Sequence, residues 1–382
     1  MGCEDEIRGR CGPLERIIVK GFRSMRECDV PLRGMNVLVG GNGSGKSNLL
    51  SIFELLRHVL DRDLDAYVGE EGSRSLFFKG VESAGEICVE LWFRNGGYGF
   101  ELAPAAGGIA LVDEWIDPGD PASASDEGRE TFDRIRPGSG HSEPELGDGL
   151  ESGSGARIAS RVGRPLCRAY RFCGSGRDSP ARRPSPIDDD TSLADDARNL
   201  AAFLYRLKQT EPKSYGNIVD AVRMSAPFFD DFILRPDPLN PDTVRLEWKA
   251  VGGDMPFSVH QLSDGTLRFI CLATLLLQPK HLMPVTIVID EPELGLHPAA
   301  ILMLAEIMRG ITDGDTDDPR QIIISTQSVD LLSEFDPSDV IVAERDGDAS
   351  VFRRIGGGEL ERWLEDYSLG EIWKKNLIGG RS

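Results

Sequence analysis

One segment decides the fold of this chain, and it reads Met35-Asn36-Val37-Leu38-Val39-Gly40-Gly41-Asn42-Gly43-Ser44-Gly45-Lys46-Ser47. Its last eight residues meet the spacing G-x-x-x-x-G-K-S, in which glycines let backbone N–H groups turn inward around a phosphate. An apolar, strand-like run precedes the loop, and a helical pattern of apolar residues begins at Lys46. A glycine-rich turn in front of a helix is the structural alternative, but the strand-to-helix context favours phosphate binding.

The loop predicts ATP and Mg²⁺ as ligands. Lys46 is expected to bind the β and γ phosphates, and the Ser47 hydroxyl to coordinate Mg²⁺. The other predicted nucleotide contacts lie in the turn itself, at Asn42, Gly43, Ser44 and Gly45.

The second motif is an apolar run, residues 285–289, that is followed directly by two carboxylates, Asp290 and Glu291. A buried strand of this kind delivers its acids to the edge where α/β sheets bind ligands. We expect Asp290 to support Mg²⁺ through water and Glu291 to be the general base that orients the attacking water. The alternative, an acidic turn that caps a helix, is disfavoured because the phosphate loop is also present.

A third motif, residues 261–266, precedes an apolar helical pattern. Locally, Ser263 or Asp264 is best interpreted as a helix N-cap. A hydroxyl, the glycine Gly265 and a helix N-terminus also form an anion site. The order of the segments favours this second interpretation: phosphate loop, long insertion, residues 262–266, acidic strand end, then another strand.

In this order and content the chain resembles the ATP-binding-cassette (ABC) ATPases of the RecF, SMC and OLD group, and within it the stand-alone bacterial ATPases labelled AAA-family. The matching segments are residues 16–24, 40–47, 262–266, 290–298, 325–328 and 363–373. The resemblance implies an α/β ABC-type head that dimerises head to tail, so that Ser263 and Gly265 act on the ATP of the partner copy. Leu294–His297 would communicate across that dimer. Arg23 matches a basic residue near the nucleotide, and a plain surface arginine is an equal alternative.

The chain departs from the family pattern at two points. Gln327 stands where such ATPases usually have histidine, and glutamine can donate a hydrogen bond but cannot carry a proton, which predicts slow turnover. The glutamine that usually follows the early strands is not identifiable, because residues 76–80 contain none.

The 382 residues, 40% hydrophobic and 28% charged, predict a globular protein. We expect residues 1–80 to form the first half of the head and residues 259–382 the second half. Residues 81–258 are expected to form an inserted β-plus-helical lobe, including a disordered loop at 117–190 that is rich in Gly, Pro, Ser and acids. An amphipathic helix is predicted at 193–208. No sustained heptads occur, so no coiled-coil arm is expected.

The net charge of −20 argues against non-specific coating of nucleic acid. The stretch Arg157–Arg183 reverses this locally with eight arginines and one acid. In one interpretation these arginines bind phosphates or an acidic partner. In the other they lie in a solvated loop and pair with the acidic stretch before them, and the two interpretations are equally favoured. Scattered cysteines without a CxxC pair predict reduced thiols and a cytoplasmic protein. No apolar run approaches the roughly 20 residues of a membrane helix.

These features predict Mg²⁺-dependent ATP hydrolysis coupled to homodimerisation. The expected setting is bacterial DNA surveillance, repair or anti-phage defence, with a separately encoded nuclease or toxin effector. A nucleotide-gated scaffold or sensor with little turnover is the alternative, and an importer ATPase subunit is disfavoured. His260 and His297 are expected to be structural, and the tail with Trp363, Tyr367 and Trp373 to dock on the domain.

Overall fold

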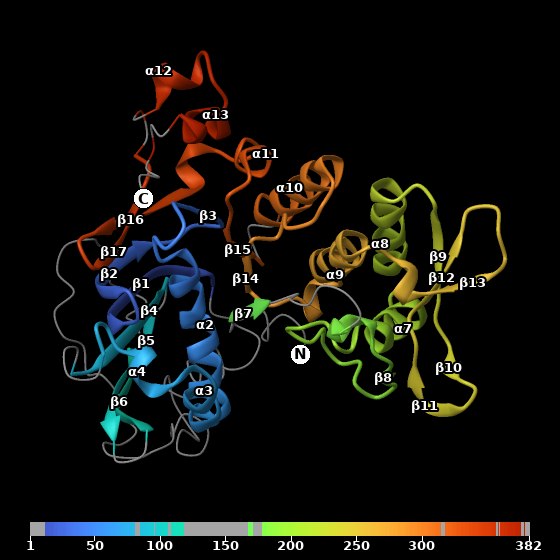
Figure 1. Cartoon of the computed structure of the whole chain (residues 1–382), viewed down its shortest axis with the longest axis horizontal. Helices are drawn as coiled ribbons and strands as arrows, with labels where there is room; N and C mark the ends of the chain where they lie inside the picture. The colour runs from blue at the N-terminus through green and yellow to red at the C-terminus, as the bar shows by residue number, and fades with distance from the viewer. Residues whose placement is uncertain are drawn as a thin grey trace, which may run out of the picture.

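The computed structural model describes residues 12–80, 85–94, 96–105, 108–117, 167–170, 178–314, 318–356, 358, 360–375 and 378. Figure 1 shows two parts: a head that contains both the blue and the red ends of the chain, and a green-to-yellow lobe beside it. None of the helices in these described ranges is long and apolar enough to cross a membrane.

The centre of the head is a six-stranded sheet with the order β17-β16-β3-β15-β14-β7. All neighbouring pairs are parallel except β16 and β17, which are antiparallel. The central strands are buried on both faces, which is why they read as continuous apolar runs in the sequence. The strands are β3 (Met35–Val39), β7 (Cys167–Tyr170), β14 (Thr286–Asp290), β15 (Gln321–Ser325), β16 (Val340–Asp346) and β17 (Ala349–Arg354). The expectation that the two ends of the sequence build one α/β sheet is confirmed.

A five-stranded antiparallel sheet of order β2-β1-β4-β5-β6 forms the other side of the head. Helix α2 (Lys46–Asp61) shares one hydrophobic core with both sheets. The strands are β1 (Leu14–Phe22), β2 (Met25–Pro31), β4 (Ile87–Phe93), β5 (Gly96–Ala105) and β6 (Gly108–Asp117). From the sequence, residues 87–117 are expected in the inserted lobe. In the structure they extend the first sheet, because β4 pairs with β1 and buries its alternate residues in the same core.

Within the described residues 178–258, the lobe consists of two helices and two small antiparallel sheets. The helices are α7 (Leu200–Thr210) and α8 (Pro212–Ser225). The strands are β8 (Ser185–Pro186), β9 (Phe229–Ile233), β10 (Pro236–Asp237), β11 (Asn240–Val244), β12 (Glu247–Ala250) and β13 (Pro256–Ser258). The lobe shares a second core with α9 (Asp264–Leu277) and α10 (Pro298–Thr312).

Two details of the lobe differ from the expectation. Helix α7 begins at Leu200 instead of 193, because the Asn199 side chain holds the preceding turns: its Oδ1 accepts from Ala194 N and its Nδ2 donates to carbonyls of Asp189 and Ser192. Part of the predicted 117–190 loop is structured, since β7, the 3-10 helix η2 (Pro180–Arg182) and β8 lie within it. Residues 118–166 and 171–177 lie outside the described residues.

The C-terminal tail contacts α11 (Val329–Leu332) through α13 (Leu369–Lys374), whose Leu369 and Ile372 are buried. Trp363 in α12 (Glu361–Leu364) keeps 44% of its surface exposed, so it contributes less to this docking than expected. The remaining short elements are α3 (Leu64–Glu71), α4 (Ser73–Leu76), η3 (Val259–Gln261), η4 (Lys280–Leu282) and η5 (Pro337–Asp339).

Candidate functional site

The predicted phosphate loop joins the carboxyl end of β3 to the first turn of α2. Gly45 has φ +104°, and a Cβ atom there would lie 2.2 Å from Ser350 Oγ. A Cβ atom on Gly40 would lie 2.4 Å from the backbone oxygen of Ala343. Glycine is therefore required at both positions, and the loop is seated directly on β16 and β17.

Lys46 is the first residue of α2 and is buried. Its Nζ donates hydrogen bonds to the carbonyl oxygens of Gly40 and Gly41, at 2.7 and 3.1 Å. Burial lowers the pKa of the Lys46 ammonium, and the nearby charges of Glu291 and Asp290 act in the opposite direction. The side chain is thus a desolvated cation within the field of the two acids at the end of β14.

Asp290 is the last residue of β14 and pairs with Ser325 at the end of β15, and Glu291 follows it directly. Ser325 connects them: its hydroxyl donates to Asp290 Oδ1 and accepts from Glu291 N, the latter at 3.1 Å. Glu291 has φ +45°, an uncommon conformation for a residue other than glycine. Arg268 of α9 donates to the carbonyl oxygen of Glu291 at 2.8 Å. Backbone strain of this kind is held by surrounding contacts and is concentrated at functional sites.

Gln327 follows β15, and its Nε2 donates to Glu291 Oε1. The backbone beside it is held by the buried carboxylate of Glu293, whose Oε1 accepts from Thr326 Oγ1 at 2.6 Å and from Gln327 N at 3.1 Å. Burial raises the pKa of Glu293. Ser325, Thr326 and Glu293 belong to the matching segments 290–298 and 325–328. Their roles depend on the pairing between β14 and β15, so the sequence does not predict them.

Ser263 is the N-cap of α9, and its Oγ accepts a hydrogen bond from Thr266 N at 3.0 Å. The residue remains exposed. A Cβ atom on Gly265 would lie 2.1 Å from the carbonyl oxygen of Gly295. The capping interpretation is therefore realised, and the same turn packs tightly against the segment Leu294–His297.

Arg182 lies directly behind this turn, with only 4% of its side chain exposed. It donates to the carbonyl oxygens of Val259 (2.6 Å) and Leu262 (3.2 Å) and forms an ion pair with Asp264 at 2.7 Å. At this residue the expected pairing with the preceding acidic stretch is wrong, because Arg182 is buried and its carboxylate partner is Asp264, 82 positions further along the chain. Residues 157–166 and 171–177 of the stretch lie outside the described residues.

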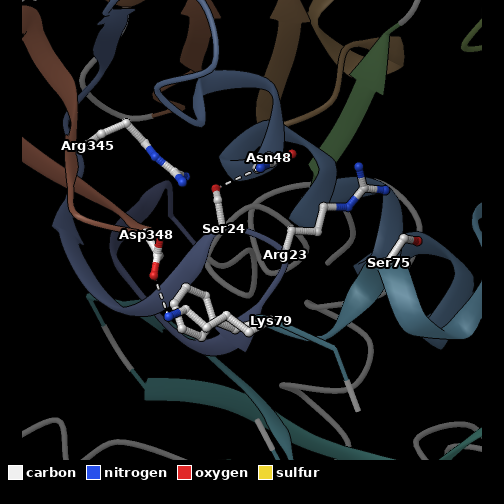
Figure 2. A pocket seen from close by; sticks show the side chains of 8 residues that line it. Arg23, Ser24, Asn48, Ser75, Lys79, Arg345 and Asp348 are labelled. Atoms are coloured by element: carbon white, nitrogen blue, oxygen red, sulfur yellow. Dashed lines mark hydrogen bonds and ion pairs between the residues drawn. The ribbon is translucent and has the colours of Figure 1, made fainter. Parts of the chain in front are cut away.

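A pocket of about 350 Å³ lies beside the first turn of α2 (Figure 2). Asn48 of that turn donates to Ser24 Oγ at 2.7 Å, and Lys79 forms an ion pair with Asp348 at 2.5 Å. Arg23 has φ +49° and bonds Glu71 at 2.7 Å. The lining residues are Arg23, Ser24, Asn48, Ser75, Phe78, Lys79, Arg345 and Asp348. Three of these residues are basic and one is acidic, which suits an anionic or polar ligand.

The predicted structural role of the histidines is met at His297, which caps α10 by accepting from Ala299 N at 3.3 Å. His260 is exposed in η3. Across the described ranges, no group of three or more His, Cys, Asp or Glu side chains is placed to hold a metal ion. A metal here would therefore need oxygen ligands from a bound phosphate and water as well as from the protein.

Two families of ATPase domains match two separate segments of the chain. Residues 157–333 match the family described as "AAA domain, putative AbiEii toxin, Type IV TA system", and residues 13–82 match "AAA ATPase domain". Among curated proteins, the chain is 51% identical over 47 residues to the DNA replication and repair protein RecF of Vibrio atlanticus (strain LGP32), and 47% identical over 47 residues to that of Vibrio campbellii (strain ATCC BAA-1116). Each match spans 12% of this chain and only 13% of the relative.

Solved SMC head structures share the fold over almost the whole chain. The SMC head bound to the C-terminal winged-helix domain of ScpA has a TM-score of 0.59 at 17% identity, and the comparison covers 92% of this chain and 99% of that one. The Pyrococcus furiosus SMC head with an extended coiled coil, bound to the C-terminal domain of ScpA, has a TM-score of 0.56 at 16% identity, with 93% and 99% covered. The fold is that of an ABC-type P-loop ATPase head, as the sequence predicts.

Proposed function

We propose that this chain, which has the fold of an ABC-type P-loop ATPase head, binds and hydrolyses ATP with Mg²⁺ and that a second copy completes the site. The observation that carries this proposal is the meeting of three segments at one edge of the sheet. Lys46 follows β3, Gln327 follows β15 and Glu291 follows β14, and these three strands are adjacent in the order β3-β15-β14. A cation for the phosphates, a general base and a hydrogen-bond donor are the groups that phosphoryl transfer to water requires.

The phosphates would lie on the backbone of Asn42, Gly43, Ser44 and Gly45, where the N-terminus of α2 adds partial positive charge. Lys46 would exchange its bonds to the loop carbonyls for bonds to the β and γ phosphates. The pocket that contains Arg23 adjoins this loop through the Asn48–Ser24 bond and is proposed to receive the base and ribose. Its Lys79 and Arg345 lie where they could bind polar atoms of the nucleotide.

The site fits Mg²⁺. Ser47 is exposed in the first turn of α2, and Asp290 presents a half-buried carboxylate at the end of β14. Hydroxyl and carboxylate oxygens are ligands that Mg²⁺ accepts, with the rest of its coordination sphere made of phosphate oxygens and water. When bound, Mg²⁺ would neutralise charge on the β and γ phosphates. We assign Ser47 to direct contact and Asp290 to contact through water.

Glu291 is proposed to orient the attacking water and accept its proton. Its backbone is held by Ser325 and Arg268, and Gln327 donates to its carboxylate, so the side chain is directed without being a metal ligand. A positioned general base contributes about 10²–10⁴-fold to the rate. Because the amide of Gln327 carries no titratable proton, it positions Glu291 rather than shuttling protons.

A second copy is proposed to bring Ser263 and Gly265 to the γ phosphate. The exposed Ser263 hydroxyl and the N-terminus of α9 form an outward-facing polar surface. Leu294, in the segment that packs on Gly265, keeps 51% of its apolar side chain exposed. An apolar side chain beside an outward-facing anion site is consistent with an interface that forms when ATP is bound.

The test compares the wild-type chain with Glu291→Gln, with Lys46→Ala as a control that should not bind ATP. We expect the wild type to hydrolyse ATP and Glu291→Gln to lose about 100-fold or more in turnover while it forms an ATP-dependent dimer that persists. Light scattering coupled to gel filtration measures the dimer. If wild-type turnover is already negligible and the mutation leaves assembly unchanged, the hydrolytic proposal fails and a nucleotide-gated scaffold or sensor takes its place. The Gln327–Glu291 bond is the observation that favours this second function.

We further propose a cytoplasmic role in DNA surveillance, repair or anti-phage defence, with a separate nuclease or toxin effector. The short match to RecF proteins and the family description that names a toxin support this proposal. Nucleic acid would bind through the arginines of Arg157–Arg183 other than Arg182, which is committed to Asp264. Identifying what co-purifies with the intact chain, with and without ATP, tests it; recovery of neither nucleic acid nor an effector protein would count against it.

A further inference from the structure

The turn that contains Ser263 and Gly265 has an acidic residue at its centre, Asp264, and a buried arginine behind it. We propose that Arg182 is a positioning residue for the ATP site of the partner copy: it neutralises and holds the Asp264 carboxylate so that the N-terminus of α9 can approach the γ phosphate. This inference rests on the proposed function, since it requires that the turn act on ATP bound by a second copy.

Both terminal nitrogens of the Arg182 guanidinium bond to this one turn. One terminal nitrogen donates to Val259 O, and the other donates to Leu262 O and to Asp264 Oδ1. These three partners lie within six consecutive residues that end at the helix start. Arg182 itself belongs to η2, 82 positions away from Asp264. The contact is therefore a long-range tertiary contact that fixes the turn, and not a local helix cap.

The negative charges of Asp264 and of ATP explain why a cation is needed behind the turn. The helix dipole stabilises an acid in the first turn of a helix. This explains why an aspartate is favourable at position 264 when no second copy is bound. The triphosphate of ATP is strongly anionic, so an unpaired carboxylate between Ser263 and Gly265 would repel it. Asp264 is 47% exposed and Arg182 only 4%, so the cation approaches from the protein side and leaves the outer surface of the turn open.

The opposite side of the turn is already fixed. Gly265 lies so close to the carbonyl of Gly295 that no side chain fits between them. Arg182 and Gly295 therefore hold the turn from two sides, and the Ser263 hydroxyl is oriented by Thr266 N. Removing the arginine frees one side of the turn and restores one negative charge to it.

A role of Arg182 in stability alone and a role in neutralising Asp264 predict different results. If Arg182 only stabilises the fold, its substitution lowers the Tm, and removing the Asp264 charge does not restore the Tm. Charge neutralisation would weaken ATP-dependent dimerisation, and removing the Asp264 charge would restore it. Nucleotide binding by the single chain would not change, because Lys46 and its loop belong to the other half of the composite site.

The experiment uses the full chain carrying Glu291→Gln as the parent and measures the ATP-dependent dimer constant by sedimentation, with fluorescent ATP for single-chain binding. Arg182→Gln should weaken the dimer at least about tenfold, which corresponds to 1.4 kcal/mol, while single-chain affinity stays constant. Arg182→Gln with Asp264→Asn should recover most of that loss. Arg198→Gln, at an exposed arginine of the lobe that pairs locally with Asp196, is the matched control and should match the parent.

If Arg182→Gln dimerises as tightly as the parent, or if the double variant does not recover dimer affinity, the inference is overturned and the proposed function still stands. A parent that does not dimerise with ATP overturns the proposed function and this inference together. If Arg182→Gln does not fold, Arg182→Lys replaces it, because lysine keeps the charge. The dimer dissociation constant of Arg182→Lys should stay within about threefold of the parent value, which is the change expected when an ion pair is rearranged but kept. A larger loss in a folded Arg182→Lys chain contradicts neutralisation.

Discussion

The close approach of Gly265 to Gly295 allows one substitution to test the composite site. In Gly265→Ala, the added Cβ would lie 2.1 Å from Gly295 O and 3.1 Å from Gly295 C. Real Cβ atoms do not come closer than about 3.0 Å to such an oxygen, so the two segments must separate by roughly 0.9 Å. Both partners are backbone, so no side-chain rotation can relieve the contact.

Overpacking of this kind costs about 1–3 kcal/mol. Alanine is about 1 kcal/mol more favourable than glycine in a helix, which offsets part of that cost because Gly265 lies in the first turn of α9. We therefore expect a net loss of up to about 2 kcal/mol and, because a chain of this length has a large entropy of unfolding, a Tm lower by only about 1–2 °C for each kcal/mol. The displacement also moves the Ser263 turn relative to Leu294–His297, which is proposed to face the partner copy.

The assays separate these two effects. Calorimetry or circular dichroism measures Tm, fluorescent ATP measures binding by the single chain, and phosphate release measures turnover. We expect unchanged single-chain affinity and turnover reduced about tenfold or more, a factor that corresponds to 1.4 kcal/mol. Gly216→Ala in α8 is the matched control, because a Cβ there meets nothing within 4 Å; it should be neutral or stabilising. If Gly265→Ala turns over ATP as fast as Gly216→Ala, the packing of these two segments is not needed for activity.

Three further results are expected. Gly45→Ala should abolish fluorescent-ATP binding, because its Cβ would lie 2.2 Å from Ser350 Oγ at φ +104°. Gly43→Ala is also strained, at φ +76°, but its Cβ meets nothing within 4 Å, so it should bind ATP more tightly than Gly45→Ala; equal binding by both would contradict the loop geometry. The pKa of Glu293 is raised by burial, so the folded state favours its protonated form, and the associated stability is lost as pH rises from about 4.5 upward. Glu293→Gln should therefore gain Tm relative to the wild type with rising pH, and the reverse trend would refute this. Burial raises the pKa of Cys28 and of Cys271 to about 12, so both thiols should resist iodoacetamide at pH 8 in the native chain, as mass spectrometry can show, and rapid labelling of either would refute it.

The sequence by itself determined the features that depend on neighbouring residues. The spacing of Gly40–Ser47 places a loop between a strand and a helix, and the run that ends at Asp290 is apolar enough to require burial on both faces of a sheet. Ser263 precedes an apolar helical pattern and is found as its cap. Backbone conformation and hydrophobic periodicity act over a few residues, so these elements were predicted close to their observed bounds.

Only the tertiary structure decided which distant groups meet. Residues 87–117 have strand patterning, but their partner β1 is chosen by burial of a shared face in one core. Arg182 reads as one arginine among eight, and only folding places its guanidinium against Asp264. Ser325 and Glu293 acquire their roles because β14 and β15 align their ends. A buried charge or hydroxyl must find a partner, and that partner is set by the packing of the whole chain rather than by spacing along it.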